Sequence, residues 1–189
     1  MSEQYSHFPD FTKISHLTCE DSYIAPEDTV LRFFFNSYSN SYKTDMQIEE
    51  SIRKRFDDLK KMAQKDMGEA LGLEYTVISR DEMIATMPVN ENTIQPMGIL
   101  HGGASVVLAE TLSSIGAWLN LTDDTKIAVG LEINANHIKT VRAGQTVTGI
   151  AKPLHRGAQT QVWETRIETD TGKLVCISRC TIAIIKKKK

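Results

Sequence analysis

Cysteine, excess basic charge and long apolar segments are all scarce in this chain, and each scarcity excludes a class of protein. Three cysteines among 189 residues are too few, and odd in number, for a disulfide framework. No apolar run is long enough to cross a bilayer, and residues 1–10 lack the basic and apolar segments of a signal peptide. We therefore expect a cytoplasmic protein with no membrane partner.

The charge and the motif content exclude further classes. A formal net charge of −2 leaves no basic footprint, so nucleic acid is not an expected partner. The chain has no Walker-type or GxGxxG loop, which removes the usual signals for nucleotide hydrolysis and dinucleotide binding. Cys176 and Cys180 have no His or Cys pair at ligand spacing nearby, so we predict no metal site.

A change in composition near Asp45 divides the chain. Residues 1–45 are rich in Ser, Asn, Tyr and Phe without clean periodicity, which predicts a poorly ordered or loosely docked N-terminal extension. Residues 46–185 hold enough apolar sequence for one domain, and the lysines of residues 186–189 are typical of a solvated tail. A methionine at this boundary suggests the hypothesis that translation begins at Met46.

Periodicity and turn residues predict the elements of the main domain. An apolar stripe after residue 46 predicts an amphipathic surface helix, and its members are Ile48, Ile52, Phe56, Leu59 and Met62 or Ala63. Strands are predicted at residues 73–79, 83–87, 126–139, 146–155, 159–168 and 173–185. Short turns join the last four strands, which predicts an antiparallel meander. With one buried helix before it, this sheet indicates an α+β fold, the sheet curling round the helix.

The predicted buried helix carries one charge. Residues 102–122 are apolar on nearly every side of a helical projection, which is typical of a buried helix, and Glu110 is their only ionisable side chain. Burying an unpaired carboxylate is costly, so Glu110 requires either a specific partner or a function. Glu110 is therefore our first candidate for a catalytic residue.

Further polar groups gather around the start of this helix. Gly102 and Gly103 leave backbone N–H groups uncovered at the positive end of the helix dipole, which suits a carbonyl oxygen that gains negative charge. Gln95 and His101 lie just upstream in an otherwise apolar loop. Ser114 follows Glu110 by one turn, on the same helical face.

The spacing of two candidates predicts a site shared between chains. His101 and Glu110 are nine residues apart, so within one helix they point to roughly opposite sides at a separation of about 13 Å. One reacting atom cannot contact both, and a second copy of the chain would have to supply one of them. The spacing also argues against metal ligation, which favours three or four residues.

The residues around the helix resemble a known family. The stretches Gln95–Glu110 (QPMGILHGGASVVLAE) and Val129–His137 (VGLEINANH) resemble the signature of hotdog-fold acyl-CoA thioesterases over residues 46–185. The subgroup that acts on aromatic acyl-CoA is the most similar, including 1,4-dihydroxy-2-naphthoyl-CoA hydrolases of menaquinone synthesis. This resemblance implies a hotdog fold, a long central helix wrapped by a curved antiparallel sheet, and subunits paired as dimers with shared active sites, often as tetramers.

The resemblance also implies residue roles. Glu110 would be the catalytic carboxylate, acting as general base on water or as a nucleophile that forms a mixed anhydride. The Gly102 N–H would polarise the thioester carbonyl, and Gln95 and His101 would line the carbonyl and the leaving thiolate. Ser114 would position the attacking water. The CoA arm of the substrate would be lined by Gly130, His137, Ile138, Lys139, Thr140, His155, Arg156, Gly157, Ala158, Gln159 and Thr160. CoA is part of the substrate, and no separate cofactor is expected.

Other interpretations of the same residues remain open. Glu110 could be a buried structural acid bonded to Ser114 or to backbone, and Gln95 could satisfy loop backbone groups. Hotdog hydratases and dehydratases also divide a histidine and an acid across a helix, although the sequence His101-Gly102-Gly103-Ala104 fits hydrolysis better. A non-catalytic acyl-CoA-binding module is the third alternative, and it would have no use for a carboxylate beside the thioester.

Overall fold

The computed structural model describes residues 46–62 and 66–187, so the prediction for residues 1–45 lies outside the described residues. The helices are α2 (Glu50–Met62), α3 (Met67–Ala70) and α4 (Gly102–Leu119). The strands are β1 (Gln47–Ile48), β2 (Glu74–Ile78), β3 (Met83–Pro88), β4 (Lys126–His137), β5 (Thr146–Arg156), β6 (Thr160–Thr169) and β7 (Leu174–Lys186). No helix in these two ranges is long and apolar enough to span a membrane.

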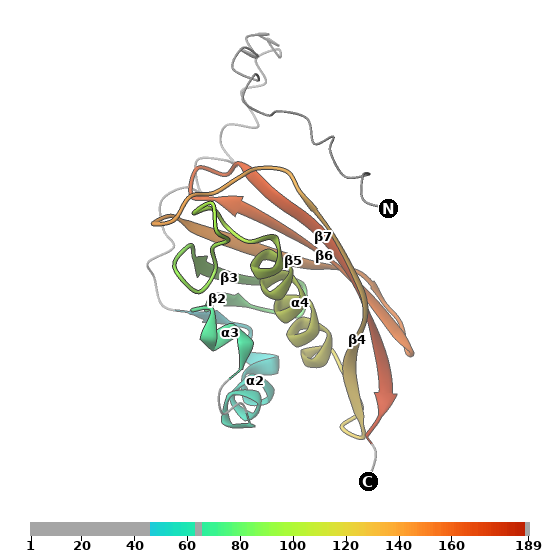
Figure 1. The fold of residues 1–189 in the computed structure, drawn as a ribbon. Coiled ribbons are helices and arrows are strands. Elements are labelled where there is room, and N and C mark those ends of the chain that lie inside the picture. Colours follow the sequence, from blue (N-terminus) through green and yellow to red (C-terminus); the bar gives the residue numbers. More distant parts are fainter. Residues whose placement is uncertain (1–45, 63–65, 188–189) are drawn as a thin grey trace, which may run out of the picture.

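The strands form one curved sheet that wraps round α4 (Figure 1). Their order is β1-β2-β3-β5-β6-β7-β4, and every neighbouring pair is antiparallel except β1 with β2. Leu108 and Leu112 of α4 pack with Trp163 and Ile167 of β6 in the core, all fully buried. The predicted α+β architecture, a central helix within a curved sheet, is confirmed.

The predicted four-strand meander is wrong in one respect. β5, β6 and β7 do follow one another in the sheet, but β4 pairs with β7 at the far edge and β5 pairs with β3. Alternation of side chains specifies which face of a strand is buried, and it carries no information on which strand lies alongside. The consequence for the site is that β4 is an edge strand.

The amphipathic helix is shorter than its sequence pattern suggested. Ile52 and Phe56 are buried on α2 as predicted, but Ile48 lies in β1, which pairs in parallel with β2 before the helix begins at Glu50. At the other end of the domain, Lys186 is the last residue of β7 and pairs with Lys126. The sequence pattern placed Ile48 in a helix and Lys186 in a tail, but strand pairing includes both residues in the sheet.

One face of α4 is buried, and the other is only partly covered. The side toward the sheet is fully buried, whereas Val106, Val107 and Ile115 on other sides are half-buried. Glu110 is exposed in the single chain, so the expectation that it is buried is wrong here. The apolar pattern on all sides of this helix therefore predicted more burial than the described residues of one chain provide.

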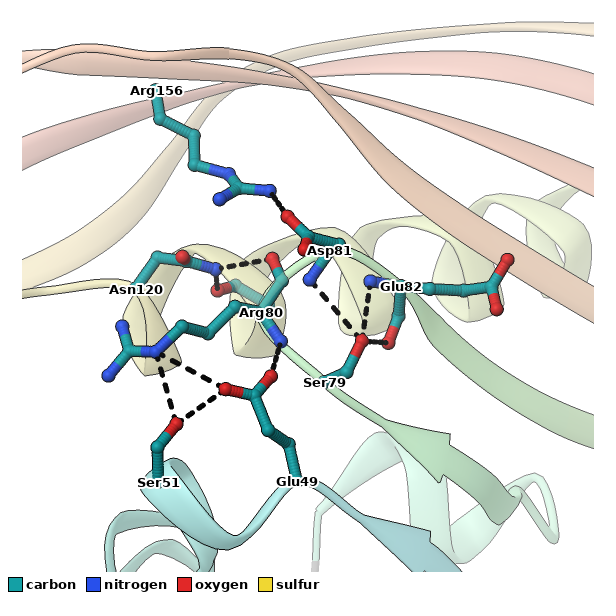
Figure 2. A network of polar contacts seen from close by, with 9 residues as sticks. Glu49, Ser51, Ser79, Arg80, Asp81, Glu82, Asn120 and Arg156 are labelled. Carbon is teal, nitrogen blue, oxygen red and sulfur yellow. Dashed lines mark hydrogen bonds and ion pairs between the residues drawn. The ribbon is translucent and has the colours of Figure 1, made fainter.

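Hydrogen bonds join the C-terminal end of α4 to the turn between β2 and β3 (Figure 2). The Asn120 side-chain amide donates to the carbonyls of Gly116 and Arg80, both at 2.9 Å, and so joins the helix end to the β2–β3 turn. The Glu49 carboxylate accepts the Arg80 N–H at 2.8 Å, and this bond holds the pKa of Glu49 below its usual value. α4 is thereby fixed at its C-terminal end, which leaves its N-terminal end to form the site.

Candidate active site

Two backbone N–H groups at the start of α4 differ in whether they have a hydrogen-bond acceptor. The Gly103 N–H donates to Nδ1 of His101 at 2.8 Å, and His101 is the N-cap of the helix. Among the residues that the structure describes, the Gly102 N–H has no hydrogen-bond acceptor. It is therefore a free donor at the positive end of the helix dipole, as the sequence analysis predicted for this residue. The same expectation for Gly103 is wrong, because the side chain of His101 accepts its N–H.

His137 lies directly against Gly102. A Cβ atom added at Gly102 would come within 2.6 Å of Nε2 of His137, closer than real side chains approach. The end of β4 and the start of α4 are therefore in contact through an imidazole that a side chain at residue 102 would displace. Two of the predicted site residues are brought together in this way.

A pocket of about 260 Å³ opens beside these two residues. It is lined by Gln95, Ile99, Leu100, Gly102, Ser105, His137, Ile138, Lys139, Thr140 and Val175. Six of the predicted site residues share this pocket, namely Gln95, Gly102, His137, Ile138, Lys139 and Thr140. The free Gly102 N–H thus lines a cavity with a mixed polar and apolar wall, as a site for a small organic ligand requires.

Gln95 serves both the loop and the pocket. Its side-chain Oε1 accepts the Met97 N–H at 2.6 Å, and its backbone C=O accepts the Gly98 N–H at 2.9 Å. Gln95 therefore does satisfy backbone groups of its own loop, which is one of the interpretations that the sequence left open. Because Oε1 is occupied, the amide NH₂ is the part of the side chain left to donate to a ligand in the pocket.

Glu110 lies away from this pocket, against β4. A Cβ atom at Gly130 would come within 2.9 Å of the Glu110 carboxylate, so these two predicted site residues are also in contact. Burial, together with the negative charges of Glu110 and Glu132, raises the pKa of Cys180 to about 12. Glu110 is not part of the pocket lining, so one chain does not bring it to the Gly102 N–H.

The predicted residues fall into two groups at opposite ends of β4. His137 pairs with Cys176 of β7, whereas the 157–159 turn lies beside the other end of β7, where the Ile184 N–H donates to the Gln159 carbonyl at 2.8 Å. Gly130 pairs with Ile182 near that same end. The seven residue steps from Cys176 to Ala183 span about 23 Å at roughly 3.3 Å per residue. We call the predicted residues that line the pocket, Gln95, Gly102 and residues 137–140, the pocket half, and the group at Glu110, Gly130 and residues 155–160 the carboxylate half. His101, which caps α4 beside Gly102, is not among the pocket-lining residues.

The remaining predicted residues have the following positions. Ser114 is half-buried on α4, one turn after Glu110. Arg156 forms an ion pair with Asp81 of the β2–β3 turn, as Figure 2 shows, so its charge is already partly neutralised. His155 lies close to Gly157, where a Cβ would come within 2.6 Å of its Nε2. In the described ranges, no group of three or more His, Cys, Asp or Glu side chains is placed to hold a metal ion.

Four pocket residues were missed by the sequence analysis, namely Ile99, Leu100, Ser105 and Val175. Ser105 is 1% exposed and Val175 is 3% exposed, and both line the pocket. Ser105 follows Gly102 by three residues and so lies on the same face of α4, a signal that helical spacing could have supplied. Val175 has no such signal, because its position depends on the pairing of β7 with β4.

The fold and the site define a class of protein, the α+β hotdog proteins, in which a curved sheet wraps a central helix whose start lines a ligand pocket. A family model described as the thioesterase superfamily matches residues 97–176. The putative esterase ComA2 of Bacillus subtilis is 51% identical over 63% of this chain and 94% of its own length. By these matches the chain belongs to the thioesterase superfamily, and it is a thioester hydrolase.

Two further relatives support this assignment. The 1,4-dihydroxy-2-naphthoyl-CoA hydrolase of Escherichia coli is 46% identical over 67% of this chain and 92% of its own length. The crystal structure of the thioesterase HI1161 from Haemophilus influenzae superposes with a TM-score of 0.63 at 43% identity, over 69% of this chain and 90% of that one. The resemblance stated from the sequence motifs is confirmed.

Proposed function

We propose that this enzyme hydrolyses aromatic acyl-CoA thioesters, with 1,4-dihydroxy-2-naphthoyl-CoA of menaquinone synthesis as the first candidate, in the cytoplasm. The observation that carries the proposal is the free Gly102 N–H, which lines a pocket at a helix N-terminus. The relative from Escherichia coli, named for that substrate, supports the choice of acyl group. Hydrolysis of a thioester needs water as its only co-reactant, and we propose that no metal or separate cofactor takes part.

The proposed chemistry begins at the thioester carbonyl. The Gly102 N–H donates to the carbonyl oxygen, which gains negative charge as the carbonyl carbon is attacked. As a general base, Glu110 removes a proton from water while the water oxygen bonds to that carbon. The C–S bond then breaks, the electron pair leaves on the CoA sulfur, and the acid is released. As a nucleophile, Glu110 instead forms a mixed anhydride that water later cleaves. Ser114 would position the water.

The substrate test is a panel of thioesters. Free-thiol release is measured with 1,4-dihydroxy-2-naphthoyl-CoA, benzoyl-CoA, phenylacetyl-CoA and straight-chain acyl-CoA thioesters of matched concentration. We expect kcat/KM for the aromatic members to exceed that for the alkyl members by at least tenfold, a difference of about 1.4 kcal/mol in transition-state binding. Equal or higher values for the alkyl members would contradict the aromatic specificity while leaving thioester hydrolysis intact.

We further propose that the active site forms between two copies of the chain. The pocket half and the carboxylate half lie at opposite ends of β4, and the pocket volume of about 260 Å³ is below the range of ligand sites, which span ~300–1,000 Å³. β4 is an edge strand that exposes Val129 (41%) and Leu131 (63%), so its outer side is suited to a partner. Antiparallel pairing of two β4 edges would bring the pocket half of one chain to the carboxylate half of the other.

Subunit complementation tests this arrangement. Glu110→Gln disables the carboxylate half and Gly102→Ala disables the pocket half, so each variant alone should be nearly inactive. A heterodimer purified by two different affinity tags would contain one site with both defects and one intact site. We expect it to recover about half of the wild-type kcat per dimer, because an isologous dimer has two equivalent sites.

Two results would contradict the shared site. Heterodimers with no more activity than the parent variants would show that each chain completes its own site. A wild-type enzyme that is fully active while monomeric by size-exclusion chromatography with light scattering would show the same. A dimer and a tetramer are both compatible with the proposal, and the same measurement distinguishes them.

A further inference from the structure

We infer that Gly103 is a positioning residue: its N–H binds Nδ1 of His101 and thereby fixes the imidazole with its proton on Nε2, the ring nitrogen that does not take part in this contact. This inference deepens the proposed function, on which its kinetic part rests. It assigns separate tasks to the two adjacent glycines, since the Gly102 N–H is left for the substrate and the Gly103 N–H holds the histidine.

The hydrogen bond determines the tautomer. The Gly103 N–H is a donor, and it lies 2.8 Å from Nδ1 of His101, so Nδ1 must accept and therefore carries no proton. A neutral imidazole has one N–H, which must then be on Nε2. The ring consequently presents a hydrogen-bond donor rather than an acceptor at its outer nitrogen, which suits a carbonyl oxygen or a departing thiolate.

The rest of His101 is fixed by the backbone. Its N–H donates to the Thr93 carbonyl at 2.8 Å, and its C=O accepts the Ala104 N–H at 3.0 Å. With Nδ1 bound to Gly103, every polar group of the residue except Nε2 has a partner. The backbone of His101 is therefore held by two hydrogen bonds and its imidazole by one, and Nε2 is left unpaired among the described residues.

Glycine at residue 103 is required for this contact. A Cβ atom there would come within 2.9 Å of Nδ1 and 3.1 Å of Cε1 of His101, so any side chain would displace the ring. The helical backbone itself makes no such demand, since Gly103 has an ordinary negative φ angle and alanine is the better helix former. Residue 103 is a glycine because the imidazole of His101 occupies the space that a side chain would need.

Capping alone does not explain the histidine. Asn, Asp, Ser and Thr cap helices well, and each could accept the Gly103 N–H with a side-chain oxygen. What histidine adds at residue 101 is a second ring nitrogen beyond the cap, on a side chain that is exposed at the start of α4. The additional nitrogen is the part of the residue available for chemistry.

The tautomer is tested directly by NMR. Long-range ¹H–¹⁵N correlation spectra of the wild-type protein, assigned with the variant His101→Asn, report which ring nitrogen carries the proton. We expect an unprotonated Nδ1 and a protonated Nε2 for His101 in the neutral ring, and we expect Gly103→Ala to alter this pattern. A proton on Nδ1 in the wild type would overturn the inference, whatever the substrate proves to be.

Kinetics separate positioning from mere folding. His101→Asn keeps the cap acceptor but lacks the outer nitrogen, so we expect wild-type thermal stability with kcat lowered about 10- to 100-fold and KM little changed. Gly103→Ala keeps His101 but displaces its ring, so we expect a similar fall in kcat with little net change in stability, because the gain in helix propensity from alanine offsets the loss of the cap.

A double-mutant cycle then shows whether Gly103 acts through His101. In a His101→Ala background no ring is left to displace, so we expect Gly103→Ala to change kcat by less than about twofold. An equally large effect of Gly103→Ala in both backgrounds would overturn the positioning role. If the wild-type enzyme hydrolysed no thioester, the proposed function would fail, and the NMR result would still decide the tautomer.

Discussion

Replacing Glu110 with glutamine should lower kcat by about 10²–10⁴-fold, the contribution typical of a positioned general base. Glutamine keeps the size of the side chain but can neither accept a proton from water nor form an anhydride. Glu110 is exposed in the single chain and lies against Gly130, so the substitution removes no buried contact and the fold should be kept. Steady-state thiol release and thermal unfolding of the purified variant check both parts.

The matched control for this substitution is Glu132→Gln. Glu132 is an exposed carboxylate on β4, two residues from Gly130, and like Glu110 it lies close enough to Cys180 to raise the pKa of that thiol. The same change in charge is made in the same region, so a general electrostatic effect would lower both activities. We expect the Glu132 variant to keep its activity within about twofold, since surface substitutions away from a site are mild. Equal losses would remove Glu110 from the mechanism.

Isotope labelling distinguishes the two roles proposed for Glu110. In a single turnover in H₂¹⁸O, a general base leaves the label only in the product acid. A nucleophile forms a mixed anhydride, and attack of water on its protein carbonyl would place ¹⁸O in the Glu110 carboxylate. Mass spectrometry of the peptide that contains Glu110 is the measurement: ¹⁸O in that peptide shows the nucleophile, whereas an unlabelled peptide excludes only the attack of water on the protein carbonyl of an anhydride.

Local sequence patterns predicted the elements of this fold well, and their arrangement less well. The start of α4 at Gly102 follows from the glycine pair and the apolar periodicity after it, and the edges of β5 and β6 follow from turn residues. The position of β4 beside β7 depends on contacts between residues far apart in the chain, for which alternation holds no signal. The correct elements were therefore assembled into a meander that the protein does not form.

The candidate site shows the same division. Chemistry that depends on one segment was predictable, such as the free N–H of Gly102 and the helical spacing of His101 and Glu110. Contacts between segments were not, such as His137 on Gly102, or Glu110 on Gly130. The expected burial of Glu110 is wrong for the single chain because apolar periodicity does not specify how much of each helical face the rest of the chain covers. In the single chain the outer side of α4 is only half-covered.

Substituting alanine for Gly102 should lower kcat by about 10²–10³-fold, comparable to the loss of one oxyanion donor. The added methyl would lie within 2.6 Å of Nε2 of His137, so either the imidazole or the first turn of α4 must move. The N–H remains in the chain, but its alignment with the thioester carbonyl is lost. Because alanine is favoured in helices, the free energy of unfolding should not fall, and chemical denaturation checks this.

The collision with His137 makes the cause of that loss testable. In a His137→Ala background the imidazole is gone, and the methyl at residue 102 has room. If misalignment caused by the imidazole is the reason for the loss, Gly102→Ala should cost at least tenfold less in kcat there than in the wild-type background. An undiminished cost would mean that the methyl group itself blocks the substrate, and the pocket beside Gly102 would then be a steric limit on the acyl group rather than a platform for its carbonyl oxygen.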